Sequence, residues 1–174
     1  MTAKYQVDAI DQKILYYLVK DARIPFLEIA RGCGISGAAI HQRVKKMEEA
    51  GIIVGSQLIV KPKSLGYDLC AFVGITLVQL SMYNSVVEQL TKIPEVVECH
   101  FVTGVFAMLV KVYCRDNAHL MEVLVNTIQN IPGVSKTETW VSLNQAIHRQ
   151  IYVMDKKVSK TKKIRKGINI SDIR

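Results

Sequence analysis

The sequence contains no hydrophobic run as long as the ~18 residues that a membrane-spanning helix needs. The first residues, MTAKYQVDAID, lack the apolar core of a signal peptide, so we expect a cytoplasmic protein with no membrane partner. Only four cysteines occur, and none has the CxxC spacing of a zinc or redox motif. We expect all four to be reduced and mostly buried.

Residue patterns typical of enzymes and metal sites are also missing. No phosphate-binding loop, GxGxxG motif or Ser-His-Asp order occurs. Cys99 and His100 are neighbours in a predicted strand, so their side chains point to opposite faces and cannot easily share a metal ion. The other candidates lack ligand spacing or are interpreted as polar strand and turn residues: His119, His148, Glu95, Glu98 and Glu138. We expect no catalytic site, no metal and no cofactor.

What the sequence has in excess is positive charge, with a net value of +8. Residues 61–150 are neutral, with seven basic and seven acidic side chains, whereas residues 151–174 have eight basic and two acidic ones. Residues 1–60 have eight basic and six acidic side chains. A polyanionic partner is therefore indicated only for the two ends of the chain.

Residues 27–53 predict two short helices joined by a tight turn. Gly34 can adopt the positive φ that ends the first helix, and Ser36 can cap the second. Ile35 and Ile40 have the spacing of a hydrophobic staple around that cap. Together these features predict a helix-turn-helix, whose second helix can enter the DNA major groove. An ordinary solvated helix of a bundle is the alternative.

The second predicted helix, residues 37–50, has two distinct faces. Ile40, Val44 and Met47 form one apolar stripe, which we expect to pack on the preceding helices. On the polar side, Gln42 can donate and accept at an adenine edge, and the basic residues suit phosphates. The residues expected to bind DNA are Ser36, Ala38, His41, Gln42, Arg43, Lys45 and Lys46.

Helices are also expected at about residues 9–20, capped by Asp8, and from near Pro25 to Gly32. Ile52–Val60 is rich in β-forming residues and predicts a wing or a linking strand. The Pro and Gly of KPKSLGYD are typical of a hinge. We therefore expect four parts: a winged helix-turn-helix domain (1–60), a linker (61–68), a second domain (69–150) and a basic tail (151–174).

The second domain contains a weak internal repeat. Ile93-Pro94-Glu95-Val96 and Ile131-Pro132-Gly133-Val134 each lie between a predicted helix and a strand. Each half opens with a strand, at 69–80 and at 106–114, and the helices are expected at 82–92 and 117–130. Two strand–helix–strand units predict an α+β, ferredoxin-like (βαββαβ) sheet with both helices on one face.

The uncovered face of this sheet predicts self-association. The predicted strands have apolar residues of both parities, among them Phe72, Val102, Leu109 and Val141. A monomer would then expose a large apolar patch. We expect the sheet faces of a homodimer to pack together, with Trp140 at the interface or in the core. Coverage by the N-terminal domain is the alternative.

Over residues 7–147 the chain resembles the Lrp/AsnC (feast/famine) family of prokaryotic transcription regulators. The segments that carry the resemblance are VDAIDQKILYYLVKDARIPFLEIARGCGIS, AAIHQRVKKMEEAGIIVG, KPKSLGYDLCAFVGITL, IPEVVECHFVTGVFAMLVKV and IPGVSKTETWVSL. The resemblance implies an N-terminal winged helix-turn-helix, a C-terminal effector-sensing domain, and dimers that often assemble into octamers.

The resemblance also implies that a small effector, commonly an amino acid, binds at the loop equivalent to residues 103–107. Many members have Gly-Asp-Tyr-Asp there, whereas this chain has Gly104-Val105-Phe106-Ala107. Without those carboxylates we expect free amino acids to bind weakly or not at all. The effector residues implied are Thr103, Gly104, Val105, Phe106, Ala107, Thr137 and Thr139.

These observations predict a sequence-specific DNA-binding transcription regulator, at least dimeric, that responds to a small metabolite or acts without one. The basic residues after Asp155 are expected to form a solvated extension, or an arm on DNA phosphates. Two alternatives stay open. One is an architectural DNA-compacting protein, and the other is a ferredoxin-like enzyme.

Overall fold

The computed structural model describes residues 5–153. The chain divides into two compact units: the helices before residue 58 belong to one, and residues 58–148 form the other. In the described part of the chain, no helix has the length and apolar character needed to cross a membrane. The expectation of a solvated tail or arm after Asp155 concerns residues outside the described range.

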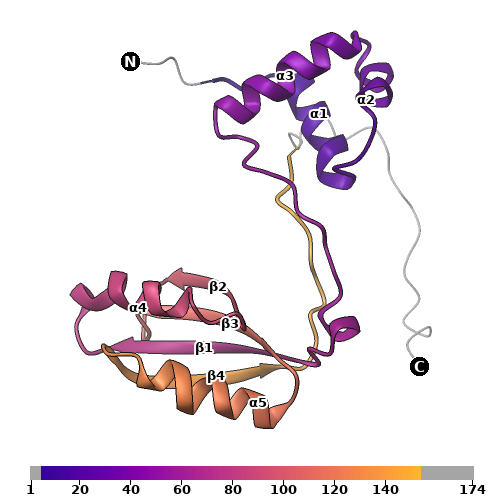
Figure 1. The fold of residues 1–174 in the computed structure, drawn as a ribbon. Helices are drawn as coiled ribbons and strands as arrows, with labels where there is room; N and C mark the ends of the chain where they lie inside the picture. Colours follow the sequence, from indigo (N-terminus) through magenta and orange to yellow (C-terminus); the bar gives the residue numbers. More distant parts are fainter. Residues whose placement is uncertain (1–4, 154–174) are drawn as a thin grey trace. The chain divides into compact units, whose positions relative to one another are not determined.

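The N-terminal unit contains three helices, α1 (Ala9–Lys20), α2 (Phe26–Cys33) and α3 (Gly37–Glu49) (Figure 1). The Asp8 carboxylate caps α1, and Gly34 ends α2 at φ 70°. The hydroxyl of Ser36 accepts a hydrogen bond from the amide of Ala39 at 3.2 Å, which caps α3. All three predicted helices are confirmed, although Pro25 precedes α2 instead of lying within it.

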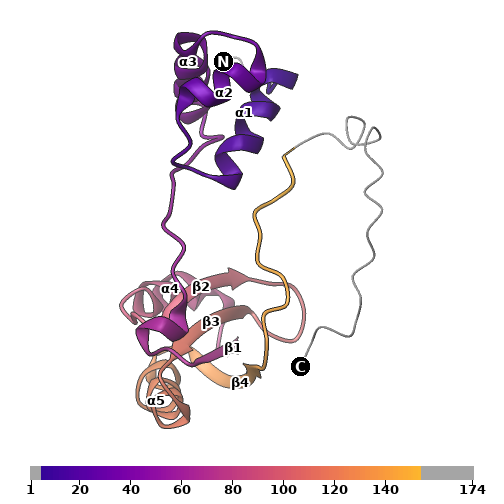
Figure 2. The ribbon, with the colours of Figure 1, turned by 90° about the vertical axis from the view of Figure 1, so that its right-hand side faces the viewer.

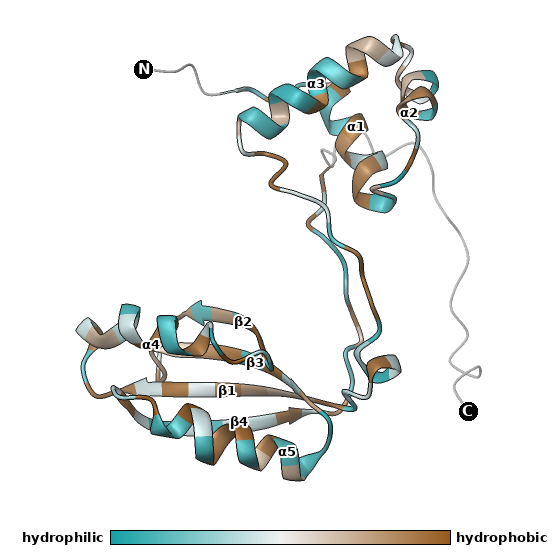
Figure 3. Ribbon diagram, viewed as in Figure 1, coloured by the Kyte–Doolittle hydropathy of each residue, from teal (hydrophilic) through white to brown (hydrophobic). Residues whose placement is uncertain are grey.

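The apolar stripe of α3 lies in the core of this unit. Ile40, Val44 and Met47 are buried there against Ile14 and Ile29. Because the stripe is fixed by this core, the opposite face of α3 must point away from the unit. Figure 3 shows the hydrophilic residues that cover much of this helix.

Residues 52–60 form no strand, so the strand predicted at Ile52–Val60 is wrong. Their β-forming side chains remain outside any core, with Leu58 73% exposed and Ile59 76% exposed. A strand needs a hydrogen-bonded neighbour, and the described chain offers none to this segment. Its next regular element is a short 3-10 turn, η1 (Pro62–Leu65), ended by Gly66 at φ 83°.

The second unit is a four-stranded antiparallel sheet in the order β2-β3-β1-β4. Its elements are β1 (Leu69–Leu77), η2 (Leu80–Met82), α4 (Tyr83–Leu90), β2 (Val96–Phe101), β3 (Met108–Cys114), α5 (Asn117–Glu122), η3 (Val123–Thr127), η4 (Ile128–Asn130) and β4 (Val134–Ser142). This order and the two intervening helices confirm the ferredoxin-like prediction.

Both helices lie on the same side of the sheet (Figure 2). Val73 and Val110 face them from the strands, and Val86 and Leu120 face the strands from the helices. Successive side chains of a strand point to opposite faces of the sheet, so Phe72, Leu109 and Trp140 lie on the other side, which we call the open face. The expected helix 117–130 is not uniform, since η3 is a π-helical turn and η4 is a 3-10 turn.

Two further expectations for the strands need correction. The strand expected to reach Leu80 ends at Leu77, because Leu80 starts η2. Val141 pairs with the buried Ala71 and so lies on the helix side, while its neighbour Trp140 pairs with Phe72 on the open face. The open face therefore includes Trp140 and not Val141.

Candidate DNA-binding and effector-binding sites

The exposed face of α3 is continuous and carries most of the residues predicted to bind DNA. Gln42, Lys46 and Ala38 are exposed, and Lys45 is 69% exposed despite a loose contact of 3.8 Å with Glu49. The ring of His41 is also exposed and lies 5.9 Å from the ring of Phe26, centroid to centroid. The small side chains at the start of α3 leave its first turn open to approach. This face can therefore offer amide and ammonium donors to a polyanion.

Arg43 differs from the other predicted DNA-binding residues, because its guanidinium is held within the unit. Its Nη1 donates to Asp8 at 2.7 Å and to Asp11 at 2.8 Å. Asp11 is almost fully buried, with 1% of its surface exposed. It also accepts hydrogen bonds from the Tyr5 hydroxyl at 3.0 Å and from the Asp8 amide at 3.1 Å. Arg43 therefore attaches α3 to α1 through its Nη1.

The contacts within the cluster formed by Tyr5, Asp8, Asp11 and Arg43 shift the pKa values of Asp8 and Arg43. The Asp11 amide and the Arg43 guanidinium, which both donate to Asp8, hold the pKa of that carboxyl below its usual value. The hydrogen bonds that Arg43 donates to Asp11 and Asp8 raise the pKa of Arg43, and the bond to Asp11 has the larger effect. Because the folded-state pKa of Asp8 is the lower one, its contribution to stability is present above about pH 4 and is lost in more acidic solution.

The predicted effector loop joins β2 to β3 at one end of the sheet. Val102 donates its amide to the carbonyl of Ala107 at 3.0 Å, and Ala107 donates to the carbonyl of Ile75 at 3.0 Å. Gly104 has φ 130°, a conformation that L side chains rarely adopt. Val105 is 83% exposed at the tip. The loop has a hydrogen-bonded base and an apolar tip.

The structure divides the predicted effector residues between the two faces of the sheet. Thr137 pairs with the buried Ile75, and Thr139 pairs with the buried Val73, so both threonines lie on the helix side. The Thr137 hydroxyl accepts a hydrogen bond from Gln129 at 2.8 Å. Phe106, in contrast, lies on the open face. A single protomer therefore does not bring Thr137 and Thr139 together with Phe106.

Phe106 occupies a place on the open face that only glycine at position 74 permits. Its ring packs edge-on against Trp140, with the centroids 5.3 Å apart and the planes at 73°. A Cβ at Gly74 would lie 2.7 Å from the Cγ of Phe106. This contact was not predicted from the sequence. A glycine inside an otherwise apolar strand was its available signal.

Charged side chains surround the apolar centre of the open face in pairs of opposite sign. Lys111 on β3 contacts Glu98 on β2 at 2.8 Å, and Lys136 contacts Glu138 on β4 at 2.7 Å. The hydrogen bond from Lys111 lowers the pKa of Glu98. The open face thus carries little net charge. It offers apolar contact area without strong repulsion between like surfaces.

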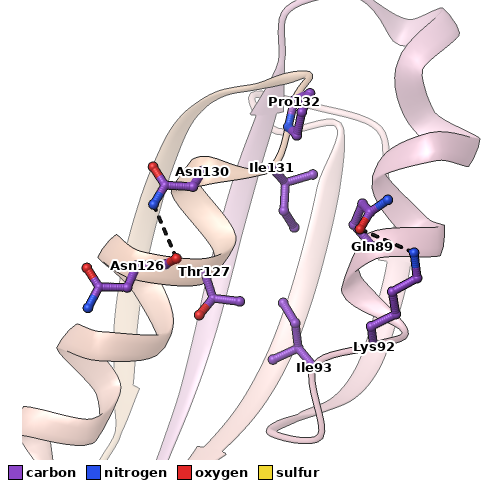
Figure 4. A pocket seen from close by; sticks show the side chains of 8 residues that line it. All are labelled: Gln89, Lys92, Ile93, Asn126, Thr127, Asn130, Ile131 and Pro132. Carbon is purple, nitrogen blue, oxygen red and sulfur yellow. Dashed lines mark hydrogen bonds between the residues drawn. The ribbon is translucent and has the colours of Figure 1, made fainter.

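Two shallow cavities occur in the second unit. One, of about 300 Å³, lies between the C-terminal ends of the two helical segments, with Gln89 and Lys92 on one side and Asn126, Thr127 and Asn130 on the other (Figure 4). None of the predicted effector residues lines it. The other, of about 510 Å³, lies at the hinge end of the open face, beside Phe72, Lys111 and Tyr113.

The cysteines show no feature of a reactive or metal-binding site. All four are free, as expected, but only Cys114 is fully buried, and burial raises the pKa of its thiol to about 11. Burial likewise raises the pKa of Cys33, Cys70 and Cys99. Within residues 5–153, no three His, Cys, Asp or Glu side chains gather in a way that could hold a metal ion.

Comparisons with known proteins match both units. A family model described as the Lrp/AsnC ligand binding domain matches residues 70–152, and one described as winged helix-turn-helix DNA-binding matches residues 7–54. The regulatory protein AsnC of Haemophilus influenzae is 42% identical over 147 residues, which are 84% of this chain and 98% of that protein.

Solved structures agree with this match. The structure of Escherichia coli AsnC has a TM-score of 0.81 at 40% identity and covers 85% of this chain and 99% of its own. A feast or famine regulatory protein from M. tuberculosis, complexed with L-methionine, has a TM-score of 0.80 at 27% identity and covers 86% and 100%. From its helix-turn-helix, its ferredoxin-like domain and these relatives, the chain belongs to the Lrp/AsnC family of DNA-binding transcription regulators.

Proposed function

We propose that this regulator reads DNA with the exposed face of α3. The observation that carries the proposal is the continuous row of exposed polar and basic side chains opposite the buried stripe of Ile40, Val44 and Met47. Gln42 is the proposed base-reading residue, and Lys45 and Lys46 are the proposed phosphate contacts. Ser36, Ala38 and His41 complete the contact face, and Arg43 is left out because it is held by Asp8 and Asp11.

Selection of DNA fragments from a random pool tests this function. A sequence-specific regulator will enrich one family of sites and bind them at least about 10³-fold more tightly than unrelated DNA at the same salt concentration. Equal affinity for both kinds of DNA would instead favour an architectural DNA-compacting protein. Failure to retain either would contradict the proposal.

The proposed oligomer is a dimer formed through the open face. Leu109, Phe72 and Trp140 supply an apolar centre, and Trp140 is 46% exposed in the single chain. A twofold arrangement would also place two copies of α3 against half-sites about one helical turn of DNA apart, or multiples of that. Further assembly into an octamer is proposed only from the family resemblance.

Leu109→Glu is expected to convert the dimer to a monomer, because it places a charge in the apolar centre of the interface. Analytical ultracentrifugation will measure the change. Met121→Glu is the matched control, since Met121 is 67% exposed on α5, away from the open face. A dimer that withstands Leu109→Glu, or a wild-type protein that is monomeric, would contradict this interface.

The proposed effector contacts the loop at residues 103–107. Because Val105 and Ala107 stand where many family members have carboxylates, the loop has no acidic group to pair with a ligand's ammonium. Loss of such a pair costs about 1.5–3 kcal/mol, or tenfold to several hundredfold in affinity. We propose that the effector is more apolar than a polar amino acid or lacks an amino group, or that none is needed.

Calorimetry against the twenty amino acids tests this prediction. We expect no micromolar Kd for any polar amino acid with the wild-type chain. The double variant V105D/A107D restores both carboxylates and is expected to bind amino acids at least tenfold more tightly. Micromolar binding of a polar amino acid to the wild type would show the prediction to be wrong.

A further inference from the structure

Phe106 connects two surfaces to which separate functions have been proposed. Its backbone belongs to the effector loop at residues 103–107, but its ring lies on the open face of the sheet. There it reaches across β1 to pack edge-on against Trp140 of β4, 5.3 Å away. A change in the loop that moves this ring must therefore alter the apolar centre of the open face.

The place occupied by the ring is closely fitted to its shape. A Cβ at Gly74 would lie 2.7 Å from Cγ and 2.8 and 2.9 Å from the two Cδ atoms of Phe106. Cγ is the atom that attaches the ring to the rest of the side chain, so rotation of the ring about its own axis cannot relieve this contact. Any side chain at position 74 would force the Phe106 side chain or its loop to move.

The hydrogen bonds of the loop leave its tip dependent on this ring. The amide bonds of Val102 and Ala107 hold the two ends of the loop at the sheet. Between them Val105 is 83% exposed, and Gly104, at φ 130°, allows the chain to turn back. Phe106 is the half-buried residue of this segment, and its packing positions the tip.

We infer that Phe106, seated on Gly74 against Trp140, couples the effector loop to self-association with a second copy of this chain. A second copy is the occupant that the open face fits, because its apolar centre lies among charge pairs that nearly cancel. The seated ring is part of the surface which that copy contacts. A ligand that holds the loop with the Phe106 ring displaced from Gly74 and Trp140 weakens association of the two copies. By linkage, association weakens binding of that ligand by the same factor. This inference rests on the proposed dimer.

Gly74→Ala tests the coupling. It should unseat the ring and raise the dissociation constant of the dimer about tenfold or more, on the scale of one aromatic pair and its buried area. Sedimentation equilibrium measures this constant. Trp140 is the only tryptophan, so acrylamide quenching of its fluorescence reports the ring directly. Quenching is measured below the wild-type dissociation constant and is expected to rise in the variant.

Two further variants make the result specific. Phe106→Ala should reproduce both changes without adding volume at position 74, and it keeps the test valid if Gly74→Ala does not fold. In the Phe106→Ala background, Gly74→Ala should have little additional effect on either readout. Val125→Ala, a matched change on η3 at the helix side of the sheet where Val125 is 46% exposed, should leave both readouts unchanged.

The possible results separate the coupling from the proposed function. Greater quenching with an unchanged dissociation constant in Gly74→Ala and Phe106→Ala would overturn the coupling while leaving the dimer in place. Unchanged quenching in Phe106→Ala would show that the Phe106 ring does not cover Trp140, and would overturn the coupling. A wild-type protein that stays monomeric would refute the proposed dimer, and the coupling with it.

Discussion

Asp11→Ala is expected to lower the free energy of opening of α1 and α3 by about 2–4 kcal/mol. The substitution removes a buried carboxylate that accepts hydrogen bonds from the Tyr5 hydroxyl, the Asp8 amide and the Arg43 guanidinium. Arg43 then keeps only the half-exposed Asp8 as a partner. Hydrogen exchange measured on peptides from α1 and α3 gives this opening free energy in the intact chain.

Asp8→Asn is the matched control for this experiment. Asn retains the ability to cap α1 but loses the charge, and position 8 is half-exposed, so we expect a change below about 1 kcal/mol. The double variant D11A/R43A should cost less than the sum of its parts, because the two residues share one interaction. An effect of Asp11→Ala no larger than that of Asp8→Asn would contradict the role of the cluster.

Gln42→Ala is expected to lower affinity for the selected DNA site about tenfold to a hundredfold, while affinity for unrelated DNA stays nearly constant. The reason is that a bidentate contact to a base discriminates by about 1–3 kcal/mol, whereas phosphate contacts do not depend on sequence. Gel retardation with specific and unrelated fragments at one salt concentration measures both affinities.

Lys46→Ala should have the complementary effect. It removes a cation that neutralises a phosphate, so binding to both kinds of DNA weakens and the slope of the salt dependence falls by about 0.9 for each phosphate left without a partner. Lys92→Ala is the charge-matched control, since Lys92 is 60% exposed on the second unit and remote in sequence from α3. If Gln42→Ala and Lys46→Ala both leave DNA retention unchanged, α3 is not the reading helix.

Local chemistry explains which parts of the fold were predictable. The turn at Gly34 and the cap at Ser36 are decided by the φ and hydrogen-bonding capacity of single residues, so the helix-turn-helix was predicted within one or two residues. The repeated Ile-Pro motifs and apolar spacings similarly indicated the ferredoxin-like order. Segment 52–60 shows the limit, because strand propensity has no effect without a partner strand.

The candidate sites depended more on long-range contacts, which local patterns do not contain. The helical pattern predicted that Arg43 faces DNA. It could not reveal the ion pair with Asp8, because that partner lies 35 residues away in sequence. Thr137 and Thr139 were grouped with Phe106 by family resemblance, and only the β1–β4 register reveals that they lie on the other face. Gly74 likewise has no role until Phe106 folds back over it.

The extended segment after α3 has a consequence for the solubility of the chain. Its extended backbone and the exposed side chains of Leu58, Ile59 and Val60 are features that favour strand addition by other molecules, the first step of aggregation. Gly55 and the pair Lys61-Pro62 act as gatekeepers, because glycine and proline interrupt strand pairing on either side. They confine the exposed β-forming stretch to residues 56–60, which is shorter than the roughly six or seven residues of a steric zipper.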